Sequence, residues 1–524
     1  MNCVAIRLRN SLPVEIAIAV ALTLGLLSGC ASVPADYPRT ASFAYTDTGD
    51  TNLGVQVREN FEGQLQQTGV FPLHSGMQAF VARMALIAAA ERSLDLQYYI
   101  WHADSSGKLL ANQLLQAAER GVRVRLLLDD LDTQGKDAGL LRLDTHPNIE
   151  VRLFNAFGYR GSRGLGFASD MRRLNYRMHN KSLTADNQLT IVGGRNIGNE
   201  YFDAAEDTAF SDLDVIAVGP LVADVSNMFD LYWNSEMVVP VAAFTGAHDL
   251  TGEALHDARV RFEASIDEEL ASPYIRAVHE SKILDELHLS RITFRWGSAQ
   301  LIYDDPSKMD HKEISEATHM APKLAPLFAN ARTEVQVVSP YFVPGDKLVA
   351  YFADLEARGT RVRILTNSLA ANDVGMVHAG YMRYRKDLLR AGVDLYEFKP
   401  DPATLNASKH WMGSSSSSLH TKFMSADGKL VFVGSFNLDP RSVALNTEMG
   451  VLFENPELDQ RMLGAFNEAV VEQAYQVQLD ASGNLLWLEH KDGETVSYHK
   501  EPHTTVWQRF VVRFLSLVVP ESML

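Results

Sequence analysis

The sequence predicts an α/β protein with two similar domains that arose by internal duplication. Three observations predict this fold class: strand–helix–strand segments that occur twice, a polar motif that occurs once in each half, and a globular composition. The chain has 524 residues, of which 46% are hydrophobic and 22% are charged. This length suits two or three domains, and this composition excludes wholesale disorder.

The duplicated segments follow the same order in both halves. A strand of β-forming residues precedes a helix, and a glycine at the end of the helix leads into a second apolar strand. Such units imply parallel pairing with helices packed on the sheet, so we expect two parallel or mixed sheets flanked by helices. The matched segments are residues 94–101 with 335–342, 109–120 with 347–358, and 121–125 with 359–363.

Changes in composition and pattern divide the chain into six parts. The expected parts are a signal peptide (1–29), a tether (30–75), an N-terminal domain (76–242), a helical insertion or linker (243–292), a C-terminal domain (293–490) and an amphipathic tail (491–524).

The repeated motif is His-x-Lys-x4-Asp-x6-Gly-[Gly/Ser]-x-Asn. A single short match is weak, but two extended copies at equivalent places of a duplicated framework are specific. The copies contain His179, Lys181, Asp186, Gly194 and Asn196 in the first half, and His420, Lys422, Asp427, Ser435 and Asn437 in the second.

The spacing of the motif indicates its chemistry. Alternate residues of a strand share a face, so the histidine and lysine of each copy project together. If the halves pack face to face, two imidazoles, two ammonium groups and two amides converge at their pseudo-two-fold interface. Such a site suits a phosphodiester, because one histidine can attack phosphorus while the other protonates the leaving alkoxide. Gly194, Asn196, Ser435 and Asn437 would then approach the phosphate.

Each histidine also needs a carboxylate to orient its second ring nitrogen. Alignment of the halves nominates Asp212 and Glu448, with Asp214 as the rival in the first half. For Asp186 and Asp427 we favour a structural role in a turn over direct chemistry, because turn aspartates often bond their own backbone.

Charge and composition exclude several functions. The formal net charge is −17, which opposes binding to nucleic acid. The chain has only two cysteines, Cys3 and Cys30, so a disulfide scaffold and a thiolate zinc site are excluded. The histidines lack the spacing of a metal site, and we expect neither a metal nor another cofactor.

The N-terminus has the pattern of a secretory signal. Arg7 and Arg9 precede an apolar run over 16–27, and residues 27–30 are Leu-Ser-Gly-Cys. This ending resembles a bacterial lipobox, which implies lipidation of Cys30. We therefore expect an envelope protein that is lipid-anchored and faces the periplasm, with the outer membrane favoured because Ala31, not Asp, follows the cysteine.

The C-terminal tail places apolar residues at helical spacing over 506–519, with Arg509 and Arg513 four positions apart. Such a face can lie on a membrane surface or pack against the protein core, and the pattern alone fits both.

The paired motifs resemble the phospholipase D superfamily over residues 76–524. The likeness is greatest to bacterial cardiolipin synthases of the C type, through the segments at 96–101, 177–181, 193–197 and 339–345. The resemblance implies a duplicated phospholipase D fold that needs no metal. It also implies a phosphatidyl-histidine intermediate on His179, with His420 as general acid and then base.

The same resemblance implies phospholipid substrates. Phosphatidylglycerol as acceptor would give cardiolipin, with phosphatidylethanolamine or phosphatidylglycerol as donor, whereas water would give phosphatidic acid. A hydrolytic phospholipase D is therefore the alternative, and a nuclease is a third possibility that the negative charge opposes. The need for an accessory protein stays open.

Overall fold

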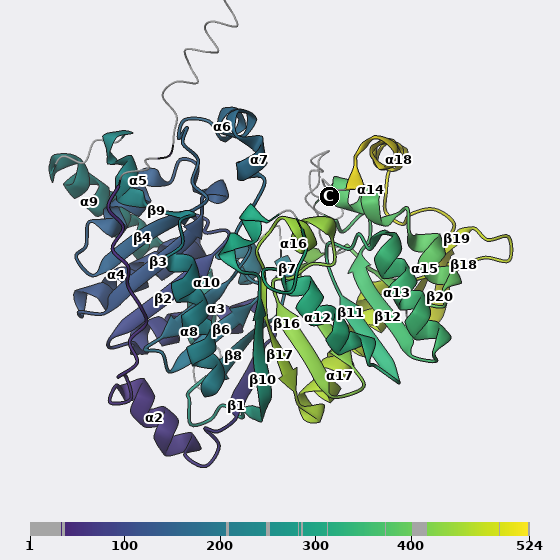
Figure 1. The fold of residues 1–524 in the computed structure, drawn as a ribbon, viewed down its shortest axis with the longest axis horizontal. Coiled ribbons are helices and arrows are strands. Elements are labelled where there is room, and N and C mark those ends of the chain that lie inside the picture. The colour runs from purple at the N-terminus through teal and green to yellow at the C-terminus, as the bar shows by residue number, and fades with distance from the viewer. Residues whose placement is uncertain are drawn as a thin grey trace, which may run out of the picture.

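The computed structural model describes residues 33, 37–205, 209–247, 252–280, 282–283, 287–311, 313–372, 374–400, 417–491 and 493–521. The signal segment and Cys30 lie outside these residues. Figure 1 shows two halves side by side, each a sheet with helices packed on it.

The N-terminal half has a mixed sheet. Its strands are β1 (Thr68–Leu73), β2 (Ser93–Tyr98), β3 (Arg123–Asp129), β4 (Ile149–Phe154), β5 (Ser182–Ala185), β6 (Leu189–Gly193), β8 (Asp214–Val218) and β9 (Val238–Pro240). Its helices are α2 (Asn52–Phe61), α3 (Gly76–Ala89), α4 (Ser105–Glu119), α5 (Asp137–Asp144), α6 (Arg163–Ser169), α7 (Met171–Leu174) and α8 (Pro220–Trp233).

The C-terminal half repeats this order after α9 (Gly252–Leu270) and α10 (Pro273–Glu280). Its strands are β10 (Arg295–Tyr303), β11 (Glu334–Val338), β12 (Arg361–Asn367), β13 (Asp394–Phe398), β15 (Phe423–Ala426), β16 (Leu430–Gly434), β17 (Met449–Glu454), β18 (Ala474–Leu479), β19 (Leu485–Lys491) and β20 (Glu494–Tyr498). Its helices are α12 (Met320–Ala329), α13 (Gly345–Ala357), α14 (Gly375–Tyr381), α15 (Arg385–Arg390), α16 (Pro440–Ala444), α17 (Pro456–Gln473) and α18 (Val506–Val518).

The predicted duplication is confirmed, and both sheets are mixed. Strands β2, β3 and β4 are parallel, as are β11, β12 and β13. The motif of each half continues into a hairpin, β5–β6 in the first half and β15–β16 in the second. The first strand of each hairpin pairs antiparallel with β2 or β11, respectively. Antiparallel pairing of β1 with β10 joins the two sheets into one of 18 strands.

An apolar core lies between the halves and fixes their relative position. It contains Val192 and Val215 from the first half and Val433 and Val451 from the second, all at most 3% exposed. Burial of one such side chain stabilises the fold by about 1.5–3 kcal/mol. A short parallel pair, β7 (Ala209–Ser211) with β14 (Ser417–Leu419), crosses the same interface.

Two expected boundaries are wrong. The segment expected as a tether contains α2 and β1, and β1 pairs with both β8 and β10 near the middle of the sheet. Gly69 and Pro72 interrupt its apolar alternation, and Gly69 is needed because a Cβ there would lie 2.9 Å from Val218 Cγ1. At the other end, β20 pairs with β19, so the expected tail begins inside the sheet.

Candidate active site

The structure brings the two predicted histidines and two predicted lysines to the interface between the halves. His179 and Lys181 precede β5, and His420 and Lys422 lie between β14 and β15. Their backbones are fixed across the interface: the His179 amide donates to the Thr447 carbonyl at 2.8 Å, as the His420 amide does to Ser211. Both imidazoles are 6% exposed and both lysines 1%.

Each histidine pairs with a carboxylate from the opposite half. His179 Nδ1 lies 2.8 Å from Glu448 Oε2, and His420 Nδ1 lies 2.5 Å from Asp212 Oδ2. Nδ1–H donation to a carboxylate leaves Nε2 as the atom that faces a substrate. Both nominated carboxylates thus contact a histidine. Each contacts the histidine of the other half, and the alignment did not predict this crossed pairing.

The rival carboxylate Asp214 has another position. It pairs with Arg83 at 2.9 Å and with Arg195 at 3.4 Å. Arg195 also donates to the carbonyl of Asp212. Asp214 therefore supports the strand end that presents Asp212, and it does not contact His420.

Glu448 is held by a network of its own. Its carboxylate accepts hydrogen bonds from Ser435 Oγ at 2.5 Å and Ser442 Oγ at 2.7 Å, and its amide donates to Asp304 at 2.8 Å. Ser442 lies on α16, outside the motif, and the sequence analysis missed it. A buried anion requires such donors, since an unpaired charge in the interior is costly.

The four residues expected at the phosphate are all buried in the site. At Gly194, the position equivalent to Ser435, a Cβ would lie 2.3 Å from Asp212 Oδ1, so only glycine permits this approach. The Asn196 amide donates to the Tyr201 hydroxyl, and its Oδ1 accepts from the Ile100 amide. Asn437 is 2% exposed. Their contact with phosphate stays a prediction.

The electrostatics favour neutral imidazoles beside ionised carboxylates. Burial lowers the pKa of His179 to about 4, although Glu448 acts to raise it. Burial and the charge of Lys422 lower the pKa of His420 to about 4. Although burial acts to raise the pKa of Glu448, His179 lowers it overall. A neutral imidazole has the lone pair that a nucleophile requires.

Aromatic side chains surround both imidazoles. Tyr99 meets His179 edge to face at 5.0 Å between ring centroids, and the ammonium of Lys181 lies 5.4 Å from the Tyr99 ring. Tyr201 and Phe210 contact His420 at 5.3 and 5.4 Å. The motif spacing gave no sign of these rings, although Tyr99 lies at the end of a duplicated strand.

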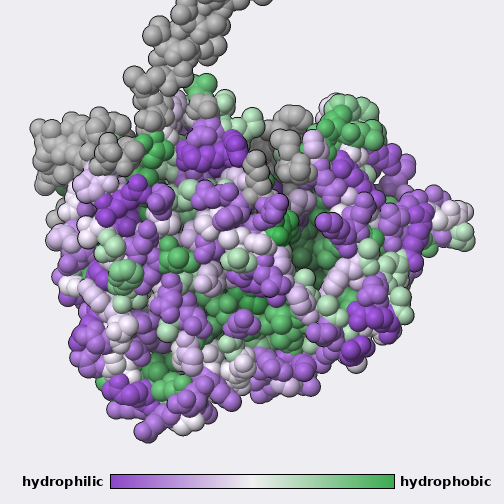
Figure 2. All heavy atoms as spheres, in the orientation of Figure 1, coloured by the Kyte–Doolittle hydropathy of each residue, from purple (hydrophilic) through white to green (hydrophobic). Residues whose placement is uncertain are grey.

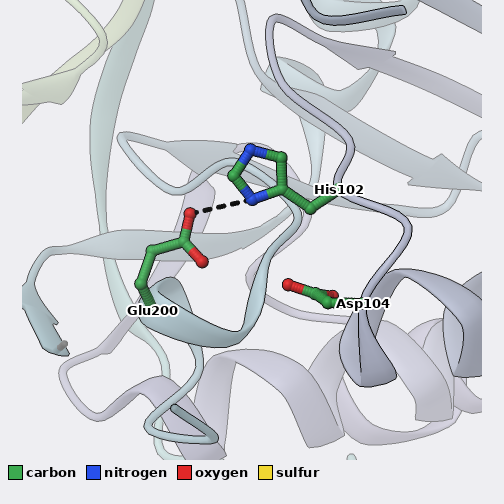
Figure 3. Close-up of side chains that lie close together, drawn as sticks. All are labelled: His102, Asp104 and Glu200. Atoms are coloured by element: carbon green, nitrogen blue, oxygen red, sulfur yellow. Dashed lines mark ion pairs between the residues drawn. The ribbon is translucent and has the colours of Figure 1, made fainter. Parts of the chain in front are cut away.

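A second polar cluster lies at the loop after β2. His102, Asp104 and Glu200 offer ligand atoms within 4.8 Å of one another (Figure 3). His102 Nδ1 pairs with Glu200 at 3.1 Å, which raises the pKa of His102. Both Asp104 oxygens accept backbone N–H groups, from Gly107 and Asn199. The His102–Glu200 ion pair and the N-cap that Asp104 provides for α4 therefore explain why these three residues lie together.

Comparison with known proteins agrees with this geometry. A family model described as "Cardiolipin synthase, PLD-like domain" matches residues 84–233 and 324–470, once in each half. The chain is 44% identical to cardiolipin synthase C of Escherichia coli strain K12, over 87% of this chain and 96% of that protein. It is 31% identical to an uncharacterised protein of Helicobacter pylori strain ATCC 700392 / 26695, over 96% and 98%.

The fold and the crossed histidines define a phospholipase D-type protein. The chain belongs to the family of cardiolipin synthases with phospholipase D-like domains. Among solved structures, phosphatidylserine synthase of Haemophilus influenzae aligns with a TM-score of 0.56 at 13% identity, over 90% of this chain and 99% of that one. This likeness shows the shared fold.

The motif aspartates lie in turns, away from the histidines. Asp186 and Asp427 have positive φ angles of 50° and 56°. The Asp186 carboxylate accepts the amides of Glu91, Arg92 and Ser93 at the start of β2, and Asp427 accepts those of Arg332, Thr333 and Glu334 at β11. This geometry supports the structural role that we favour.

We predict that Asp186→Ala lowers the free energy of unfolding by about 1–3 kcal/mol, because it leaves buried N–H groups without acceptors. The folded fraction should keep near-parental activity. Denaturant unfolding and lipid turnover measure both quantities, with Asp267→Ala, at an exposed position of α9, as control. Unchanged stability with lost turnover would instead assign Asp186 to the chemistry.

Proposed function

We propose that this chain is a phosphatidyltransferase that forms cardiolipin from phosphatidylglycerol and a second phospholipid, either phosphatidylethanolamine or phosphatidylglycerol. The observation that carries the proposal is the pair of buried imidazoles, His179 and His420, each held through Nδ1 by a carboxylate of the opposite half. The 44% identity to a cardiolipin synthase supports the choice of substrates.

The first half-reaction transfers the phosphatidyl group to the protein. Nε2 of His179 attacks phosphorus and forms a P–N bond, while the P–O bond to the donor headgroup breaks. His420 gives its Nε2 proton to the departing alkoxide. Lys181 and Lys422 hold the anionic phosphate oxygens, whose negative charge increases in the transition state.

The second half-reaction reverses these steps with a new alcohol. His420 takes the proton of a phosphatidylglycerol hydroxyl, whose oxygen attacks phosphorus. The P–N bond breaks and neutral His179 is restored. The proton that His420 needs at the start is favoured once substrate binds, because a nearby phosphate anion raises the pKa of an imidazole.

The proposal predicts cardiolipin synthesis by the full-length chain in vesicles of phosphatidylglycerol, with and without phosphatidylethanolamine. We expect His179→Ala and His420→Ala each to lower turnover by about 10³-fold or more, because both act in one chemical unit. Mass spectrometry of the products measures this, and the exposed variant His499→Ala is the matched control. Phosphatidic acid without cardiolipin would make the protein a hydrolase.

We propose that α18 contacts the membrane. Its Val512 is 5% exposed and packs beside Leu369 and Ala379. Its other face stays open, with Trp507 60% and Leu517 85% exposed. A helix with an aromatic and aliphatic face is suited to the bilayer interface. Figure 1 shows α18 on the same edge of the molecule as α6 and α7.

We also propose a lipid anchor at Cys30, in the outer membrane and facing the periplasm. Support comes from the apolar run over 16–27 and the Leu-Ser-Gly-Cys sequence that ends it. Among the described residues, no helix has both the length and the apolar character to cross a bilayer.

Membrane attachment can be measured by fractionation of cells and flotation with anionic vesicles. We expect the Cys30→Ser variant to be lost from the outer-membrane fraction. We expect the double variant Trp507→Ser/Leu517→Ser to bind vesicles about tenfold more weakly, because it buries less apolar surface in the bilayer. Val471→Ser, at an exposed valine of α17, is the control. Unchanged attachment in either variant would contradict the corresponding contact.

A further inference from the structure

An apolar cavity of about 540 Å³ lies in the C-terminal half between α12, α13 and α16. Figure 2 shows its hydrophobic walls as a hollow right of centre. Leu324 and Phe328 of α12 form one wall, Phe352 of α13 another, and Val337 and Phe436 the floor. Its volume lies within the range of about 300–1,000 Å³ that small-molecule sites occupy.

The cavity adjoins the segment that supports the active site. Successive side chains of an extended segment point to opposite sides. Ser435 points to Glu448, whereas Phe436 points into the cavity. Asp439 at the rim accepts the amide of Ser442, and the Ser442 hydroxyl donates to Glu448. One short segment therefore borders both the cavity and Glu448, the carboxylate that positions His179.

The cavity also adjoins the end of α18. Tyr384 and Glu521, which are hydrogen-bonded at 2.6 Å, line it. Val519 packs with Tyr384 against buried Val343, another lining residue. Apolar contacts thus continue from the cavity to the helix whose exposed face is suited to a bilayer.

The N-terminal half is different at the corresponding positions. Trp101 forms an isolated β-bridge with Ile197, and Phe342 forms one with Leu438. The loop that contains Trp101 is therefore equivalent to the loop that contains Phe342. The next residue is His102 in the first half, where it pairs with Glu200, and Val343 in the second, where it lines the cavity. An apolar residue at this lining position is therefore not a requirement of the fold.

We propose that this cavity binds one acyl chain of a phospholipid substrate. The inference rests on the proposed function, which supplies a ligand that joins a phosphodiester to long hydrocarbon chains. The apolar walls match such a chain, and the exposed ammonium of Lys347 beside them is suited to the ester and phosphate oxygens of the lipid. The segment 435–442 links the cavity to the site, because Phe436 lines the cavity while Ser435 and Ser442 hold Glu448.

Ala321→Trp tests the site, because Ala321 lines the cavity from α12 and a tryptophan side chain there occupies part of its volume. We expect turnover of dipalmitoyl phosphatidylglycerol to fall by about tenfold or more, since the chain loses apolar burial. Turnover of dihexanoyl phosphatidylglycerol should stay near parental. Ala357→Trp, at an exposed position of α13, is the matched control. An equal effect on both lipids, or none, overturns the proposal.

A binding measurement separates this proposal from the proposed function. In a chain with Cys3→Ser, Cys30→Ser and His179→Ala, we introduce Ala325→Cys at the cavity or Ala357→Cys outside it. Vesicles of dipalmitoyl phosphatidylglycerol should slow maleimide labelling of Ala325→Cys several-fold more than that of Ala357→Cys. Equal labelling contradicts the acyl site. Protection together with a parent that makes no cardiolipin contradicts only the proposed function.

Discussion

The imidazoles of His179 and His420 each depend on a buried carboxylate from the opposite half of the chain. Glu448 holds His179 and Asp212 holds His420, so neither half contains a complete histidine–carboxylate pair. A buried carboxylate is tolerated only where donors surround it. The serine hydroxyls on Glu448 and the backbone N–H of Leu213 on Asp212 meet this constraint. The apolar core between the halves and the β1–β10 pair then hold the two sheets in the one arrangement that completes both pairs.

The same burial gives the site its chemistry. It lowers the pKa values of both histidines to about 4, so that the free site presents neutral imidazoles. It also lowers the pKa of Lys181 well below its ordinary value. An anionic phosphodiester opposes these shifts, because it stabilises the protonated imidazole and both ammonium groups. In the proposed reaction, substrate binding thus prepares the proton that the leaving group needs.

Much of this architecture could be predicted from the sequence. The duplicated strands and the twin motif predicted the fold, and alternation predicted that each histidine and lysine project together. Alignment of the halves also found Asp212 and Glu448. Their crossed pairing could not be predicted, because it depends on how the halves pack. Ser442 and β1 were missed for a similar reason: their roles come from contacts distant in sequence, and no local pattern marks them.

The crossed pairing is tested most directly by Glu448→Gln, which keeps the shape of the side chain. An amide beside His179 favours the tautomer with the proton on Nε2, which lacks the lone pair for attack. We predict a loss in kcat of about 10²–10⁴-fold. Unfolding should be close to parental, and His179→Ala should add little further loss. Glu454→Gln, exposed on the same strand, is the control. Near-parental kcat in a folded Glu448→Gln protein would contradict the account.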